Sequence, residues 1–417
     1  MKAKIHPSTL KGEVTAPPSK SCTHRALIAA ALAAGTSIIK NPLLSRDILE
    51  TVRALEVLGA RFDQSPERIT VHGVKLERFA SLTLEIPASG STLRMLVPLL
   101  TIFTPRLEIR TTPRLLERIA TPDLKQLKGL DFSFQEDRLL VSGKFEARVL
   151  EIEPVLTTQW LSGAILVLPF LPPGTVLKTA HPLRSPSYPA LTLEVGKAFG
   201  VDFSEREGNL TVTRPGGYKA SRYSVEGDWS AAANWLVAGC FSPGLRVGGL
   251  NPSSLQPDSS ILPLLSAMGA ELRLENCFYA FSGTAPVDAA IDVSQTPDLF
   301  PVLAAFASVR PGETRIRGLE KLKYKESDRA EKMVAGLKKI GAEIEISGGE
   351  VRALGKEVLA GGEEVDVAGD HRLLMAFTAL SGKIRAPIVL DSAEGVAKSY
   401  PGFFETFVSL GGKMEKL

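Results

Sequence analysis

The sequence predicts a mixed α/β (α+β) protein made of two similar halves with three units in each. A helix-patterned segment that ends in glycine and runs into an apolar strand start recurs six times along the 417 residues, as in ALEVLGARF and GLKKIGAEI. Successive copies lie 70, 71, 69, 72 and 70 residues apart. A unit of about seventy residues is too large for a thin solenoid and suits globular halves. The six glycines are Gly59, Gly129, Gly200, Gly269, Gly341 and Gly411.

Each unit is predicted to hold a helix, a glycine stop and a pair of strands. The glycine ends the helix in a left-handed conformation that residues with a side chain adopt only at a cost. Apolar and polar residues alternate after it, as in RITVHGV and RLLVSGK. This alternation predicts that a hairpin-like pair of strands follows the glycine.

The boundary between the halves is predicted between the third and fourth units, in RYSVEGDWSAAANWLVAG. Gly227 and Asp228 in this stretch are typical of a turn and an N-cap before an alanine-rich helix. We expect substrates to bind in the cleft between the two halves, where large pockets usually form.

Composition narrows the class of partner and site. The net charge is +3 without a block of lysine or arginine, which argues against nucleic acid. The three cysteines and five histidines are scattered, so neither a disulfide framework nor a metal-ligand cluster is expected. The longest apolar stretch, from Leu161, is too short to span a bilayer, and the start shows no signal pattern. We expect a cytoplasmic protein with no cofactor and no membrane partner.

The segment PPSKSCTHRALIAAALAAG at 17–35 predicts a loop followed by a helix that closes at Gly35. Lys20, Ser21 and Arg25 lie in its first turns. The helix dipole disfavours cations there unless an anion is bound, so this segment predicts an anion site. A solvated helix start is the alternative.

Two further segments of the first half place arginine beside loops. In PASGSTLRMLVPLL, the loop around Gly90 precedes a helix that carries Arg94. A loop of such small residues exposes its backbone N–H groups to an anion. In TTPRLLERIATPDL, Arg114 follows a proline and lies four residues before Arg118. Both patterns also occur in ordinary capped helices and on solvated surfaces.

Hydroxyl-bearing segments come next in the chain. Thr157, Thr158 and Gln159 open an apolar helix, where hydroxyls and helix N–H groups suit phosphate oxygens, although a plain N-cap is the alternative. Ser185 and Tyr188 lie on a proline-stiffened loop, and the tyrosine ring can pack either on a substrate or in the core.

The second half carries charged groups at predicted helix starts. Asp298 precedes a fully apolar helix, either as its N-cap or as a base in the cleft. LKYKESDRAEKM places Lys325, Glu326 and Arg329 within one turn, as a solvated face or as part of a site.

Two more groups follow near the C-terminus. Gly369 and Asp370 are predicted to cap a helix that begins with His371 and Arg372, and Lys398 lies on a loop before the last helix. Both halves therefore offer cations at helix starts and loops, and arginines there suit carboxylate and phosphate groups.

Taken together, these motifs resemble those of the EPSP synthase (3-phosphoshikimate 1-carboxyvinyltransferase) family of enolpyruvyl transferases. PSKSCTHRAL resembles its PGSKS-x-x-x-RAL signature, KYKESDR its VKESDR signature and GDHR its NDHR signature. The resemblance covers the whole chain. It implies two pseudo-symmetric domains of three βαβαββ units each, with the active site in the interdomain cleft. The domains would be residues 1–13 with 228–417, which is discontinuous, and the inserted 14–227.

The family's reaction is implied as well. It moves the enolpyruvyl group of phosphoenolpyruvate to the 5-hydroxyl of shikimate 3-phosphate and releases phosphate through a tetrahedral intermediate, in the shikimate pathway of aromatic amino acid and chorismate biosynthesis. No cofactor is implied, and a monomer is expected. The resemblance implies that phosphoenolpyruvate contacts Lys20, Gly90, Arg114, Gln159, Arg329, Arg372 and Lys398. It implies that shikimate 3-phosphate contacts Lys20, Ser21, Arg25, Thr157, Thr158, Gln159, Ser185, Tyr188, Asp298 and Lys325.

Three side chains are our candidates for proton transfer. Asp298 is the candidate base for the acceptor hydroxyl, and Glu326 is the candidate acid at C3 of phosphoenolpyruvate and the base in the elimination. Lys20 would share either transfer.

The chain departs from the family pattern at several positions. Ala88 stands where the family usually has asparagine, and Lys321 also replaces an asparagine. Thr157 and Thr158 replace a pair of serines, and Gly369 replaces the asparagine before Asp370. These departures put single substrate contacts in doubt but remove no charge that the chemistry needs.

Two other functions stay open on the sequence alone. The sister enzyme that uses UDP-N-acetylglucosamine has an early Lys-Asn pair and a loop cysteine, whereas this chain has Lys20-Ser21 and no cysteine around Arg114. A non-catalytic anion-binding protein of the same fold would keep the cations but lose Asp298 and Glu326.

Overall fold

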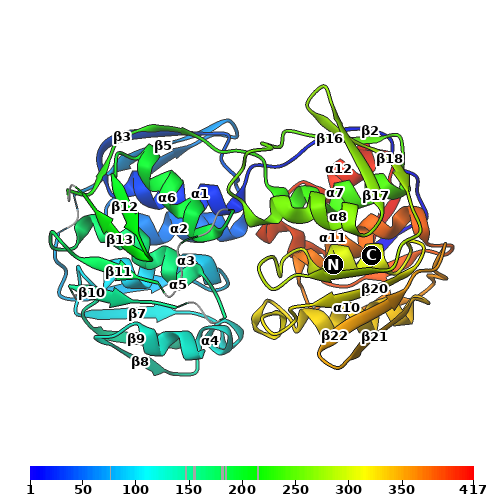
Figure 1. Ribbon diagram of the computed structural model, residues 1–417. Helices are drawn as coiled ribbons and strands as arrows, with labels where there is room; N and C mark the ends of the chain where they lie inside the picture. Colours follow the sequence, from blue (N-terminus) through cyan, green and yellow to red (C-terminus); the bar gives the residue numbers. More distant parts are fainter. Residues whose placement is uncertain (76, 146–147, 154–155, 180–182, 184–185, 214–215) are drawn as a thin grey trace. The chain divides into compact units, whose positions relative to one another are not determined.

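The computed structural model describes residues 1–417 except 76, 146–147, 154–155, 180–182, 184–185 and 214–215 (Figure 1). It divides into two compact units. The continuous unit is Pro18–Glu226, and the discontinuous unit joins Met1–Pro17 to Gly227–Leu417. No described helix is both long enough and apolar enough to cross a membrane.

Within the described residues of the continuous unit, the strands form three mixed sheets. Each begins with parallel pairing, two pairs in the first sheet and one in each of the others, and continues with antiparallel strands. The first sheet has the order β14 (Tyr218–Lys219), β3 (Ala33–Lys40), β5 (Arg68–Gly73) and β4 (Arg61–Gln64), with β15 (Arg222–Ser224) also pairing with β3. The second has the order β6 (Leu82–Glu85), β7 (Arg106–Arg110), β9 (Arg138–Gly143) and β8 (Leu130–Phe134). The third has the order β10 (Val149–Glu151), β11 (Val176–Lys178), β13 (Asn209–Val212) and β12 (Phe203–Arg206).

The helices of this unit connect and underlie those strands. They are α1 (Lys20–Ala31), α2 (Arg46–Glu56), α3 (Gly90–Leu100), α4 (Pro113–Ile119), α5 (Gln159–Val167), α6 (Tyr188–Ala198) and the 3₁₀ helices η1 (Pro122–Gln126) and η2 (Leu168–Phe170). Helices α1, α3 and α5 are buried over almost their whole length, whereas the strands alternate between buried and exposed residues. Helices that are apolar all round belong inside, and sheets with one apolar face belong outside.

The discontinuous unit repeats this plan, and the N-terminal segment contributes strands β1 and β2 to two of its sheets. Its first sheet has the order β17 (Ala270–Glu275), β18 (Phe278–Thr284), β16 (Leu245–Gly248) and β2 (Gly12–Thr15). The next has the order β19 (Ala289–Asp292), β20 (Glu313–Arg317), β22 (Glu350–Leu354) and β21 (Glu343–Ser347). The last has the order β23 (Glu364–Val365), β24 (Ile388–Leu390), β1 (Ala3–Ile5) and β25 (Met414–Lys416). Strand β2, which crosses the boundary expected after residue 13, pairs with β16 along its whole length.

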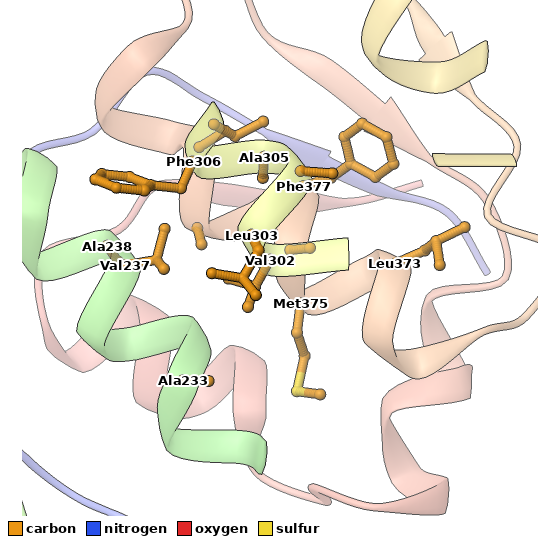
Figure 2. Close-up of a cluster of buried hydrophobic side chains, with 14 of the residues drawn as sticks. Ala233, Val237, Ala238, Val302, Leu303, Ala305, Phe306, Leu373, Met375 and Phe377 are labelled. Carbon is orange, nitrogen blue, oxygen red and sulfur yellow. The ribbon is translucent and has the colours of Figure 1, made fainter. Parts of the chain in front are cut away.

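Its helices again connect the strands. They are α7 (Trp229–Phe241), α8 (Ile261–Ala267), α9 (Phe300–Ala307), α10 (Arg329–Lys339), α11 (His371–Ala379), α12 (Phe403–Ser409) and the 3₁₀ helices η3 (Pro257–Ser260), η4 (Leu322–Tyr324), η5 (Leu380–Lys383) and η6 (Ala393–Lys398). Figure 2 shows the core between α7, α9 and α11, where Val237, Leu303, Phe306 and Met375 are buried. Several of the candidate side chains described below, such as Lys20, Gln159 and Arg372, lie at the N-terminal ends of buried helices.

The repeat prediction is confirmed in its local geometry. All six glycines have positive φ, from 78° at Gly200 to 98° at Gly341, and each follows a helix and precedes a strand. In five units the next two strands pair antiparallel. In the sixth, β25 pairs antiparallel with β1 from the N-terminal segment.

Two local expectations are wrong. The helix that begins at Lys20 ends at Ala31, and Gly35 lies inside β3 with a φ of 113°. The second copy of the repeat ends a 3₁₀ helix, η1, because Pro122 opens a segment too short for a full α-helix.

Candidate active site

The start of α1 holds its lysine against an internal carboxylate. The Ser19 hydroxyl caps the helix by accepting from the Cys22 N–H at 3.3 Å. Lys20 is the first helical residue, and its ammonium pairs with the carboxylate of Asp47 on α2. Both side chains are largely buried. The anion that a cation at this helix end requires is therefore supplied by the protein itself in this structure.

Arg25 is buried one turn further and joins three helices. Its guanidinium donates to the hydroxyls of Thr192 at 2.8 Å and Ser162 at 3.0 Å and to the carbonyl of Ser21 at 2.9 Å. It also lies 5.7 Å from the centroid of the Tyr188 ring. Burial lowers the pKa of Arg25. These partners are neutral, so they orient the guanidinium without neutralising its charge.

Tyr188 is the first residue of α6 and not part of a loop, because Ser187 caps that helix. Ser185 lies outside the described residues. The Tyr188 ring lies beside Arg25, and its packing on a substrate stays a prediction.

The N-termini of α3 and α5 are tied together by side chains. The Gln159 carbonyl oxygen accepts from Arg94 Nη1 at 2.8 Å, and its amide nitrogen donates to Ser91 Oγ at 2.8 Å. A Cβ atom added to Gly90 would lie 2.7 Å from Arg94 Nη1, so a side chain there would displace this arginine. Arg94 also donates to the carbonyl of Arg118 at 2.6 Å.

The threonine pair is fixed through its backbone. The N–H groups of Leu156 and Thr157 donate to the Asp123 carboxylate at 3.3 and 3.2 Å. The hydroxyl that caps the first turn belongs to Thr157, which accepts from the Gln159 N–H at 3.2 Å, while Thr158 occupies the N-cap position. Asp123 therefore positions the predicted phosphate-binding hydroxyls.

Arg114 is held at the surface. It is the second residue of α4, its side chain is 48% exposed, and it pairs with Glu117 at 2.9 Å one turn along the helix. An exposed ion pair of this kind contributes little to stability.

In the discontinuous unit, three cations and three acids form one network, which we call the Asp298 cluster. Asp298 pairs with Lys325 at 3.2 Å, with Arg329 at 2.6 Å and with Arg372 at 3.0 Å. Arg329, with a side chain 1% exposed, also pairs with Glu326 at 2.5 Å and Asp370 at 2.8 Å. The members of the cluster are Asp298, Lys325, Glu326, Arg329, Asp370 and Arg372.

The cluster sets the protonation of its central acid. Burial raises the pKa of Asp298, but the charges of Arg372, Lys325 and Arg329 outweigh burial and hold that pKa well below its usual range. Asp298 is therefore ionised at neutral pH. The formal charges of the six members cancel, so an incoming anion must compete with the internal carboxylates.

Local backbone structure explains how the cluster assembles. Leu299, not Asp298, is the N-cap residue of α9, which leaves the Asp298 carboxylate for the cations. Lys325 and Glu326 precede α10, whose N-cap is Asp328, so they lie in the connection rather than on a helical face. Asp370 is the N-cap of α11 and accepts from the Arg372 N–H at 2.9 Å, as predicted.

Two lysines lie beside this network. Lys398, the last residue of η6, has its ammonium 3.5 Å from the carbonyl of Gly369, which directly precedes Asp370. Lys321 donates to the carbonyl of Ser294 at 3.1 Å.

Several functional candidates carried no sequence signal. Asp47, Glu50 and Asp258 are buried acids near predicted cations, yet each lies in an ordinary helix or turn pattern. Asp258 accepts from the Ser230 hydroxyl. Burial and then the charge of Asp298 raise the pKa of Asp258 to about 7. Among the described residues, no three His, Cys, Asp or Glu side chains lie together as metal ligands would.

The chain is similar to known proteins over its full length. The family model described as EPSP synthase (3-phosphoshikimate 1-carboxyvinyltransferase) matches residues 5–407. A 3-phosphoshikimate 1-carboxyvinyltransferase of Clostridium kluyveri is 36% identical over 424 residues, covering 99% of this chain and 98% of that one. One of Aeropyrum pernix is 34% identical, covering 99% and 96%. A solved EPSP synthase from Acinetobacter baumannii superposes with a TM-score of 0.79 at 25% identity, covering all of both chains.

Proposed function

Since the chain belongs to the EPSP synthase family, we propose that it transfers the enolpyruvyl group of phosphoenolpyruvate to the 5-hydroxyl of shikimate 3-phosphate, with release of phosphate. The observation that carries the proposal is the family match over residues 5–407. The cations and acids that the reaction needs are present within that stretch. The activity places the protein in the shikimate pathway.

We assign the continuous unit mainly to shikimate 3-phosphate. Lys20, Ser21 and Arg25 at the start of α1 would meet its anionic groups, helped by the helix dipole. Arg25 supports this role because its hydroxyl and carbonyl partners leave its charge available. The same substrate would contact a second group of side chains, namely Thr157, Thr158, Gln159, Ser185, Tyr188, Asp298 and Lys325.

We propose that phosphoenolpyruvate binds cations that pair with acidic side chains of the protein in this structure. Its carboxylate and phosphate would replace Asp298 and Glu326 as partners of the arginines, which bind such groups in bidentate fashion. A Cβ atom at Gly90 would collide with Arg94, so the absence of a side chain at Gly90 keeps that arginine in place. The residues assigned to this substrate are Lys20, Gly90, Arg114, Gln159, Arg329, Arg372 and Lys398.

This exchange of partners would also prepare the acid–base groups. Asp298 would accept the proton of the 5-hydroxyl while that oxygen bonds to C2 of phosphoenolpyruvate, and Glu326 would protonate C3 to a methyl group. Phosphate then leaves, and Glu326 recovers the proton from C3 to restore the methylene. Asp298 is a weak base while three cations hold it ionised. Substrate anions that draw Arg329 and Arg372 away would raise its pKa and make it a better base.

Replacement of the two acids tests these roles. We expect Asp298→Asn and Glu326→Gln each to lower kcat by about 10²–10⁴, because each removes one positioned proton carrier. Release of inorganic phosphate in the presence of both substrates measures the loss. Glu320→Gln, at an exposed position before η4, is the matched control and should leave turnover unchanged. Near wild-type turnover in either cluster variant would show that its assigned role is wrong.

The two alternative functions, transfer to UDP-N-acetylglucosamine and non-catalytic anion binding, are not favoured. The curated relatives reported above carry the name 3-phosphoshikimate 1-carboxyvinyltransferase, not that of the nucleotide-sugar enzyme. A purely anion-binding protein would not need both Asp298 and Glu326.

We further propose that the protein is a cytoplasmic monomer whose partners are phosphoenolpyruvate and shikimate 3-phosphate. Light scattering coupled to size exclusion tests the oligomeric state.

A further inference from the structure

A buried glutamate holds the loop that precedes α3. Glu50 lies on α2, is 6% exposed, and its Oε2 accepts the backbone N–H of Ala88 at 3.1 Å and of Ser89 at 2.8 Å. Two backbone donors on one carboxylate oxygen fix that segment more firmly than a single hydrogen bond would.

The held segment carries proposed substrate contacts. Ser89 is the N-cap of α3, with its hydroxyl accepting from Thr92, and Gly90 and Ser91 follow directly. The space beside Gly90 is limited by Arg94, and Ser91 receives the amide of Gln159. A small shift of Ala88 and Ser89 would therefore move Gly90 relative to Arg94 and break the Ser91 contact with Gln159.

The segment needs an outside support because of its own sequence. Ala88 stands where the family usually has asparagine, and only its backbone groups can form hydrogen bonds. Glu50 reaches this backbone from α2, the preceding helix, 38 residues earlier in the chain. The carboxylate also lies on the same helix as Asp47, which pairs with Lys20.

From these contacts we infer that Glu50 is a positioning residue, which fixes the Ala88–Ser91 segment so that Gly90 and Ser91 are correctly placed for phosphoenolpyruvate. The inference rests on the proposed function. It assigns Glu50 no contact with substrate and no proton transfer. What matters is the reach of the acceptor oxygen to the two N–H groups, and not the negative charge.

Two conservative variants separate reach from charge. Glu50→Gln keeps an oxygen at the same distance from the helix and loses the charge, whereas Glu50→Asp keeps the charge and shortens the side chain by one methylene. We expect the aspartate variant to raise the KM for phosphoenolpyruvate roughly 10- to 100-fold, the scale of losing two backbone hydrogen bonds. Its KM for shikimate 3-phosphate should change less than about threefold, and the glutamine variant should stay within about threefold on both.

Glu56→Gln, at an exposed position at the end of the same helix, is the control and should match the wild type. The inference is overturned if the glutamine variant is impaired as much as the aspartate variant, if the aspartate variant is normal, or if both KM values rise together. A variant that merely folds poorly would lose active enzyme without this split between the two substrates. If the wild type itself releases no phosphate from the two substrates, the proposed function fails instead.

Discussion

Several of the charged residues that we assign to substrate binding form ion pairs with acidic side chains of the protein itself. Lys20 pairs with Asp47, Arg114 with Glu117, and the cations of the Asp298 cluster with its three acids. Buried ion pairs gain little net stability, because desolvation offsets much of their attraction. Their more important consequence is that the cations stay oriented while unliganded, so substrate anions exchange for internal carboxylates rather than entering an uncompensated site.

Asp258 makes stability depend on pH in a defined window. Its carboxyl holds a proton up to about pH 7 in the folded protein, against 3.8 for an ordinary aspartate. A raised pKa stabilises the fold below the unfolded value, and that stabilisation is lost as pH rises through the folded value. We expect the stability of the wild type relative to Asp258→Asn to fall between about pH 4 and about pH 7.

Urea unfolding of both proteins across that range measures the difference. Asp298 stays ionised in both because its pKa is low, so its titration cancels in the comparison. A difference in unfolding free energy that stays constant with pH would contradict the raised pKa of Asp258.

The sequence predicted residue types better than residue pairs. Lys20 and Arg25 were singled out because their local sequence resembles a family signature, and Asp298 because it precedes an apolar helix. Their partners were not, because Asp47 lies 27 residues from Lys20, and Arg372 lies 74 from Asp298. Contacts at such separations are set by packing of helices, which leaves no periodic trace in the chain.

At the scale of elements, glycine decides where helices end and how closely they pack. The six repeat glycines were predictable because a left-handed residue after a helix is a local requirement. Gly35 misled the prediction, since positive φ also occurs within β3. The β1–β25 pairing could not be read from local pattern, because its strands lie at opposite ends of the chain.

Gly163 tests the packing of α5 on α3. A Cβ at this position would lie 2.7 Å from the carbonyl oxygen of Arg94, which is backbone and cannot move aside easily. We expect Gly163→Ala to destabilise the protein by about 1–3 kcal/mol through overpacking, despite the better helix propensity of alanine. Thermal unfolding measures the shift in Tm.

Gly239 on α7 provides the matched control. A Cβ there would meet no described atom closer than 3.8 Å, so alanine fits and should leave Tm unchanged or raise it. Equal effects at the two glycines would show that α3 and α5 do not approach as closely as the structure indicates.

At the scale of the whole molecule, the chain builds one unit from its two ends. The discontinuous unit needs β1 in the middle of one sheet and β2 at the edge of another. The two ends of the continuous unit lie together, since the Ser19 N–H donates to the Glu226 carbonyl at 2.8 Å. The two units should therefore differ in their ability to fold alone.

Fragments test this difference. We expect residues 18–226 to unfold cooperatively as an isolated protein, and residues 227–417 to lack a stable fold because two sheets miss a strand. A fragment in which a short linker joins residue 417 to residues 1–17 should fold, since Lys2 and Leu417 already exchange backbone hydrogen bonds at 3.0 and 2.9 Å. Circular dichroism and urea unfolding follow each fragment. A stable fold of 227–417 alone would contradict the role of β1 and β2.

The most direct measurement is release of inorganic phosphate by the full-length protein with phosphoenolpyruvate and shikimate 3-phosphate. The account predicts phosphate release only when both compounds are present, together with a product that carries the enolpyruvyl group on the 5-oxygen. Replacing shikimate 3-phosphate by UDP-N-acetylglucosamine should give none. Absence of release with both substrates, or equal release with the nucleotide sugar, would contradict the account.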